Sequence, residues 1–82
     1  MKGWLVGMAQ QKIKFREADD IREFVNAAEK CDFDIDVCYN RVMVDAKSIM
    51  GIFSLGLYKI LTVRCHGESE DFECAIRKFA VA

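Results

Sequence analysis

Polar and apolar side chains alternate along residues 11–16, which is the period of a strand with one buried face. Ile13 and Phe15 are predicted to point into the core. Apolar residues then recur at helical spacing over roughly 20–30, directly after two aspartates that suit the positive end of a helix dipole. A strand followed by a helix is therefore expected in this part of the chain.

A second alternation of apolar and polar side chains runs over 33–39. The turn-forming pair Asn40 and Arg41 separates it from a third alternation over 42–46. Two strands joined by so short a turn are predicted to pair as an antiparallel hairpin.

Ser48 stands where a helix N-cap belongs, because it precedes a short apolar stretch, and Gly56 suits the position just beyond that helix, with positive φ. Residues 57–65 are predicted to form a fourth strand, in which Leu61, Val63 and Cys65 lie on one face. A third helix is expected to begin near Ser69. The apolar stripe of that helix consists of Phe72, Ala75, Ile76 and Phe79.

The predicted order of elements is thus βαββαβα. Helices that segregate to one face of an antiparallel sheet make an α+β fold. We therefore expect an open-faced sandwich in which a four-stranded antiparallel sheet carries three helices on one face.

Charge narrows the class of partner. The 12 basic and 13 acidic residues nearly cancel, so no long-range field for nucleic acid or an anionic membrane is expected, and the protein should select partners by local features. A chain of 82 residues has room for one core but not for a large enclosed cavity with a lid, so it should work through its surface.

The first residues support two interpretations. Residues 1–8 are either an N-terminal extension or a lead-in to the first strand, with the domain proper over 9–82. Their apolar stretch is broken by glycine and is too short for a signal peptide or a spanning helix, so a cytoplasmic protein is expected. Trp4 and its neighbours either lengthen the first strand or bury themselves in a second subunit.

Metal and cofactor sites are not expected. The four cysteines form no CxxC pair, and without a secretory signal they are expected to be reduced. Cys31 and Cys74 fall at helical apolar positions, Cys65 lies in a strand, and Cys38 is the candidate for an exposed thiol. The alternate carboxylates over 32–36 suit the solvated face of a strand better than a calcium loop.

Residues 45–57 read D-A-K-S-I-M-G-I-F-S-L-G-L and resemble the regulatory-serine segment of the HPr family, which has the form K-S-I-M-G-x-x-S-L-G. A weaker resemblance extends over about 10–82, and the family fold it implies has the element order predicted above. HPr proteins are phosphocarriers of the bacterial phosphoenolpyruvate-dependent sugar phosphotransferase system.

One departure from the family pattern concerns its chemistry. HPr proteins carry a G-[IL]-H-x-R-P-A motif between strand one and helix one, where the histidine accepts phosphate. Here residues 16–22 read R-E-A-D-D-I-R. Asp19 and Asp20 are expected to occupy the helix N–H donors and repel phosphate. The lone histidine, His66, follows strand four, and an exposed loop histidine is more often inert than a phosphoacceptor.

The resemblance implies that Ser48 is phosphorylated by an ATP-dependent serine kinase and that the modified protein binds a transcriptional repressor. Capping of helix two, which contributes about 1 kcal/mol, is compatible with that role. Ile49, Met50 and Phe53 exceed what a two-turn helix can bury, so they are expected to form an exposed patch. The resemblance implies that this patch is the docking surface, with Lys47 as its charged rim. The alternative is an overpacked core helix.

Three functions follow in order of preference. The first is a non-catalytic regulatory protein of the phosphotransferase system type, involved in catabolite repression, that docks through helix two. The second is a binding or oligomerisation module without phosphorylation, including a homodimer. The third is a phosphocarrier that uses His66. No nucleophile, base and orienting group can be assembled for an enzyme.

Overall fold

The computed structural model describes residues 9–81, and the interpretations placed on residues 1–8, including Trp4, lie outside it. The elements, in chain order, are β1 (Ala9–Ile13), α1 (Ala18–Glu29), β2 (Ile35–Tyr39), β3 (Val42–Asp45), α2 (Ile49–Leu55), β4 (Leu61–Cys65), α3 (Glu70–Ile76) and a 3-10 turn (Arg77–Phe79). This is the order predicted from the sequence. No helix in the described part of the chain is long and apolar enough to cross a membrane.

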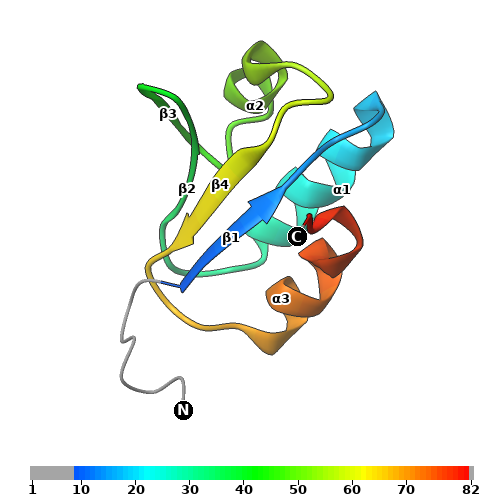
Figure 1. The fold of residues 1–82 in the computed structure, drawn as a ribbon. Coiled ribbons are helices and arrows are strands. Elements are labelled where there is room, and N and C mark those ends of the chain that lie inside the picture. The colour runs from blue at the N-terminus through cyan, green and yellow to red at the C-terminus, as the bar shows by residue number, and fades with distance from the viewer. Residues whose placement is uncertain (1–8, 82) are drawn as a thin grey trace.

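The four strands form one antiparallel sheet in the order β1-β4-β2-β3, so the last strand of the chain lies between the first two. Figure 1 shows α1 and α3 behind this sheet and α2 at its upper end, while the front face carries no helix among the described residues. The predicted α+β open-faced sandwich is therefore confirmed.

The core fills the space between the sheet and the helices, and four phenylalanine rings connect its layers. Phe15 lies edge-on to Phe24 at 5.3 Å between ring centroids and to Phe79 at 5.5 Å, and Phe24 lies 5.8 Å from Phe72. These rings come from the β1–α1 connection, α1, α3 and the 3-10 turn. Edge-to-face packing of this kind fixes the helices against one another beyond simple burial of apolar area.

The two edges of the sheet differ. Along β1, the residues that follow α3 act as a short extra strand: Lys14 N–H donates to the Phe79 carbonyl, and Val81 N–H donates to the Lys12 carbonyl, both at 2.9 Å. Along β3, at the other edge, no described residue pairs with the outer side of the strand.

Two boundaries at the start of the domain differ from the predicted ones. β1 ends at Ile13, so Phe15 reaches the core from the connection to α1 and not from a strand. α1 begins at Ala18, two positions earlier than expected. The cause is Asp20, whose carboxylate accepts the main-chain N–H groups that precede the helix and so fixes its first turn.

Two further expectations were wrong. β4 begins at Leu61, and residues 57–60 are not part of the strand. Cys74 is exposed, because α3 buries Phe72 and Ile76 on one face and a residue two positions after Phe72 points to another. The two predicted N-caps, Ser48 and Ser69, are confirmed.

Candidate functional site

Ser48 lies on the surface at the start of α2, where its backbone is extended. Its hydroxyl oxygen accepts the Gly51 N–H at 3.3 Å, and its carbonyl accepts the Ile52 N–H at 3.0 Å. The side chain thus satisfies one of the donors that a helix start leaves unpaired. An exposed hydroxyl held at a fixed place is available to a modifying enzyme.

Gly51 brings α2 close to the sheet. A β-carbon built there would lie 3.2 Å from the Ser48 hydroxyl and 3.3 Å from the Val44 β-carbon, which is tighter than ordinary contact. The absence of a side chain at this position therefore lets α2 lie close to β3.

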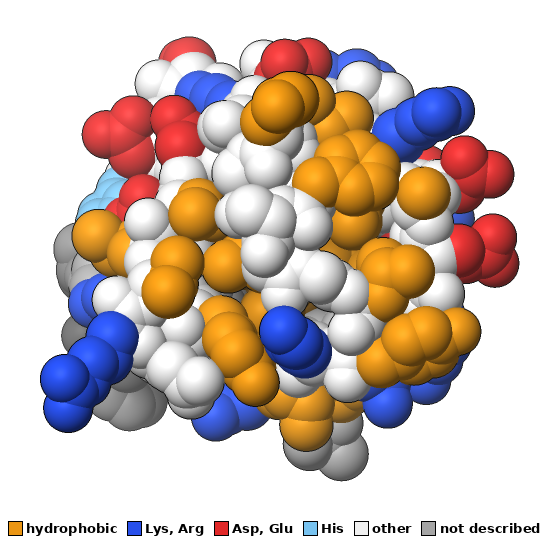
Figure 2. Space-filling view, turned by 90° about the horizontal axis from the view of Figure 1, so that it is seen from above, with side chains coloured by type: hydrophobic (Ala, Val, Ile, Leu, Met, Phe, Trp, Pro, Cys, Tyr) orange, Lys and Arg blue, Asp and Glu red, His pale blue; other side chains and the backbone are white. Residues whose placement is uncertain are grey.

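The apolar residues of α2 divide between two faces. Ile52 and Leu55 are buried in the core, whereas Ile49, Met50 and Phe53 are exposed, with Met50 at 80%. We call these three exposed residues the α2 trio. The prediction that a two-turn helix could not bury all five apolar side chains is confirmed, and the alternative of an overpacked core helix is not. Figure 2 shows hydrophobic side chains gathered over this end of the molecule.

Lys47 is not the free charged rim that the sequence suggested. It is half-buried, and its Nζ donates to the Cys31 carbonyl at 2.9 Å. That carbonyl belongs to the residues just past α1, where unpaired carbonyls attract a cation. The ammonium is thus engaged in linking α1 to the β3–α2 connection.

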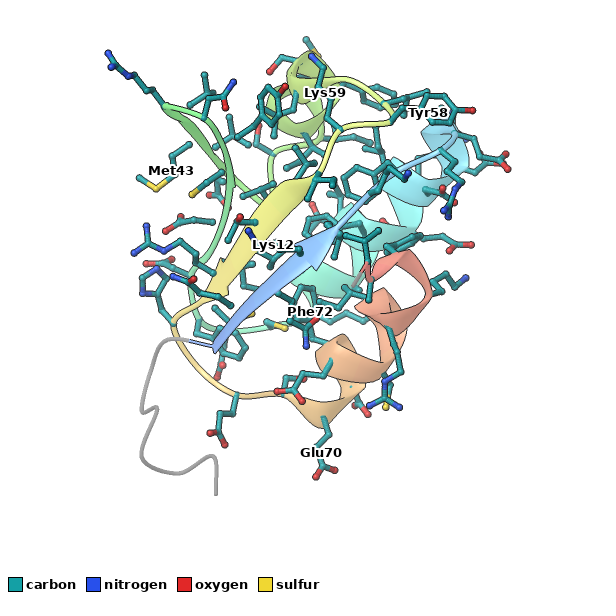
Figure 3. The ribbon with its side chains drawn as sticks, in the orientation of Figure 1. Lys12, Met43, Tyr58, Lys59, Glu70 and Phe72 are labelled. Carbon is teal, nitrogen blue, oxygen red and sulfur yellow. The ribbon has the colours of Figure 1, made fainter. Side chains whose placement is uncertain are left out.

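A different lysine stands beside α2. Lys59 Nζ lies 5.1 Å from the centroid of the Tyr39 ring and within 3.5 Å of where a Gly56 β-carbon would be. Figure 3 shows Lys59 next to α2 at the upper end of the molecule and Tyr58 farther along the same end, beside the start of α1. Both residues were predicted to lie in the fourth strand, but they precede β4. The available signal was Gly56, because a left-handed residue directly after a helix favours a loop there.

Residues 57–60 cross from α2 to β4 over the start of α1. Tyr58 has a positive φ of 62°, is 67% exposed, and its N–H donates to the Phe15 carbonyl at 2.7 Å. This hydrogen bond places the loop against the β1–α1 junction. The surface around α2 and the surface around the β1–α1 junction are therefore adjacent.

The β1–α1 junction is where the family motif would carry its phosphohistidine. Asp20 accepts the N–H of Arg16 at 2.9 Å and the N–H of Glu17 at 3.3 Å, which are donors that precede α1 and not the N–H groups of its first turn that it was expected to occupy. Asp19 does not share this role, because its carboxylate lies 3.7 Å from the Arg22 guanidinium. Both carboxylates still place negative charge at the start of α1.

His66 lies at the opposite end of β4 from this surface. Its Nε2 is 2.9 Å from the Asp36 carboxylate, and its main-chain N–H donates to the Asp34 carbonyl. Asp36 is therefore not simply a solvated strand residue, although no group of His, Cys, Asp and Glu side chains among residues 9–81 is arranged to hold a metal. The pairing fixes one nitrogen of the histidine ring against a carboxylate.

The thiols differ in their surroundings. Cys31 and Cys65 are buried, Cys38 is half-buried on the sheet, and Cys74 is exposed. Burial, with Cys31 and Glu73 nearby, raises the pKa of the Cys65 thiol from its ordinary value of 9.0 to about 11. A thiol of this kind stays protonated and is a poor nucleophile at neutral pH.

Comparison with known proteins agrees with this architecture. Crystal structures with the same fold include phosphocarrier protein HPr from Bacillus anthracis str. Ames, with 27% identity and a TM-score of 0.72 over 88% of this chain and 96% of that one. HPr-C-His from Thermoanaerobacter tengcongensis has 29% identity and a TM-score of 0.71 over 87% and 89%. Residues 13–81 match the family model PTS-HPr, described as the PTS HPr component phosphorylation site. The chain therefore belongs to the HPr family of the phosphotransferase system.

Proposed function

We propose that this chain is a regulatory member of the HPr family, one that is phosphorylated on Ser48, docks to a protein partner through the α2 trio and does not accept phosphate on a histidine. The observation that carries the proposal is the exposure of Ser48 directly beside three exposed apolar side chains on a two-turn helix. Exposed apolar groups that lie together are typical of interaction sites.

A phosphate on Ser48 would change the surface more than the fold. It would add about −1.5 to −2 units of charge and three strong acceptor oxygens at an exposed position. Nothing buried surrounds the hydroxyl, and the Gly51 N–H that it already binds can donate to a phosphate oxygen. The modified surface would present an anionic group next to the α2 trio, so a partner with an apolar groove flanked by arginine or lysine is expected.

The proposal that this chain does not accept phosphate on a histidine is based on the residues of the β1–α1 junction. Residues 16–20 contain no histidine, and Asp20 already accepts two main-chain N–H groups there. An incoming phosphate would meet two carboxylates at the start of α1. His66 offers no substitute, because its ring is paired with Asp36 and four acidic residues lie within the seven positions that follow it.

The kinase step is tested by the intact mass of the protein after incubation with ATP and an HPr-type serine kinase. The expected result is a gain of one phosphate that Ser48→Ala abolishes. Ser54→Ala and Ser69→Ala are matched controls, since Ser54 is also exposed on α2 and Ser69 also caps a helix. A phosphate that survives Ser48→Ala, or no phosphate at all, would overturn this part of the proposal.

The docking step is tested with the phosphorylated protein and a repressor of the type that HPr proteins regulate, by isothermal titration calorimetry. Met50→Ser is expected to weaken binding about tenfold or more, because an exposed methionine at the centre of an apolar patch loses its buried area on the partner. Cys74→Ser is the control, since Cys74 is also exposed but lies on α3. Equal effects of the two substitutions would argue against docking through α2.

A further inference from the structure

The outer side of β3 is an open sheet edge that no described segment covers. Edge strands are commonly shielded by lysine, proline, a bulge or a covering segment. β1 has a covering segment, whereas residues 42–45 read V-M-V-D and have none among the described residues. Val42 is 49% exposed, and Figure 3 shows Met43 projecting from β3 away from β4. This edge is suited to pairing with another strand.

The hydrogen bonds to β2 show which main-chain groups of β3 face outward. Ala46 N–H donates to the Ile35 carbonyl, and hydrogen-bonded pairs alternate along an antiparallel ladder. Val44 and Val42 therefore also bond to β2, and the groups of Met43 and Asp45 point to the open edge. The Asp45 carbonyl already accepts the Ser48 N–H, so the open groups are both of those on Met43 and the N–H of Asp45.

We propose that the open edge of β3 binds the same edge of a second copy of this chain, antiparallel about a two-fold axis at Met43. In this register Met43 faces Met43 of the second copy, and Arg41 faces Asp45 of the second copy on both sides of the axis. All the outward main-chain groups then find partners. The two four-stranded sheets become one continuous sheet of eight strands.

Charge selects this register over the others. Arg41 and Asp45 are both exposed, and neither has an ion-pair partner among residues 9–81. One Asp45 oxygen accepts the Lys47 N–H at 2.9 Å, and no bond to a described residue engages the other. A shift of the register by two residues would place Asp45 against Met43 and leave Arg41 beyond the paired segment. A parallel arrangement would bring like charges together.

The remaining side chains fit the same pairing. Met43 and Asp45 share the open face of the sheet, because alternate residues of a strand point to the same side, and Arg41 lies in the turn directly before β3. On the other face, Val42 meets Val44 of the second copy, and β-branched pairs of this kind stabilise a sheet. Since β1 is covered at the far edge, the assembly closes as a dimer and does not extend into a fibre.

The interface is small, so the dimer is expected to be weak and concentration-dependent. Sedimentation velocity of the full chain from about 10 μM to about 1 mM, a range that covers weak association, should show a monomer converting to a dimer. Arg41→Glu and Asp45→Arg should each weaken dimerisation about tenfold or more, because each replaces two attractive contacts by two repulsive ones. Arg77→Glu is the control, since it changes net charge equally at an exposed site far from β3.

Mixing the two variants gives the decisive measurement. A heterodimer of Arg41→Glu with Asp45→Arg would restore opposite charges at both contacts, so the equimolar mixture should dimerise more tightly than either variant alone. Met43→Pro, which removes an outward N–H but no bond to β2, should abolish dimerisation while circular dichroism stays native. A monomer at every concentration, or a dimer that survives both Arg41→Glu and Met43→Pro, would overturn the proposal.

Discussion

Replacing Gly56 by alanine is expected to destabilise the domain through the backbone alone. Gly56 ends α2 with φ of 90° and ψ of 177°, a conformation that is essentially restricted to glycine. A β-carbon there would meet nothing closer than Lys59 Nζ at 3.5 Å, which is ordinary van der Waals contact. Crowding therefore contributes nothing, and the cost of the substitution measures the strain of the conformation.

The magnitude follows from two opposing terms. Holding a non-glycine residue in this region costs about 1–3 kcal/mol. Alanine also lowers the conformational entropy of the unfolded chain, which stabilises the folded state by about 0.4–1 kcal/mol and offsets part of this cost. The net loss should be about 1–2 kcal/mol in the free energy of unfolding. For a domain of this size, each kcal/mol lowers the melting temperature by about 4–8 °C.

Urea denaturation followed by circular dichroism at equilibrium measures this loss. Gly51→Ala is the matched comparison, because Gly51 lies within the same helix without a positive φ, and alanine there gains about 1 kcal/mol of helix propensity against the crowding with Ser48 and Val44. Gly56→Ala should cost more than Gly51→Ala at an unchanged denaturant slope. A Gly56→Ala protein within 0.5 kcal/mol of the wild type, roughly the spread of neutral surface substitutions, would refute the reasoning.

Two more predictions concern the cap and the thiols. Ser48→Ala should lower the free energy of unfolding by about 1 kcal/mol in urea titrations, because the Gly51 N–H loses its acceptor; an unchanged midpoint would mean that the cap contributes nothing. The raised pKa of Cys65 makes the folded state bind its proton more tightly than the unfolded state does. The stability that this tighter binding contributes is present below pH 9 and is lost as the pH rises from 9 to about 11, with a total of about 3 kcal/mol. The free energy of unfolding, measured across this pH range, should depend less on pH in Cys65→Ala than in the wild type, whereas Cys38→Ala should keep the wild-type dependence. Equal pH profiles for the wild type and both variants would contradict the assignment.

The parts of the fold that follow from local pattern could be predicted from the sequence. Alternation of side chains identified β2 and β3, and the turn at Asn40 lies where it was expected, with a positive φ of 55°. Ser48 and Gly56 marked both ends of α2 because capping depends on residues within four positions of each other. The exposure of the α2 trio followed from counting apolar residues against the burial capacity of two turns.

Features that depend on distant contacts could not be predicted in this way. Lys47 binds a carbonyl 16 residues away, and His66 pairs with Asp36 across 30 residues, so neither partner has a local signal. One strand was predicted over 57–65, but the Tyr58 N–H donates to the Phe15 carbonyl, and residues 57–60 form a loop. Tertiary contacts override periodicity where the two compete.

The central position of β4 has a consequence for synthesis on the ribosome. β1 and β2 are not neighbours in the sheet, because each pairs with β4. Ala9 and Ile35, for example, both pair with Cys65, so neither can pair until Cys65 has been synthesised. The outer edge of β1 is covered only when residues 79–81 are available. A nascent chain that has emerged only to residue 60 can therefore form the β2–β3 hairpin and helices but no complete sheet. Folding of this domain should consequently be a late event, and Ile13 and Phe15, which are fully buried in the folded domain, stay accessible to chaperones until then.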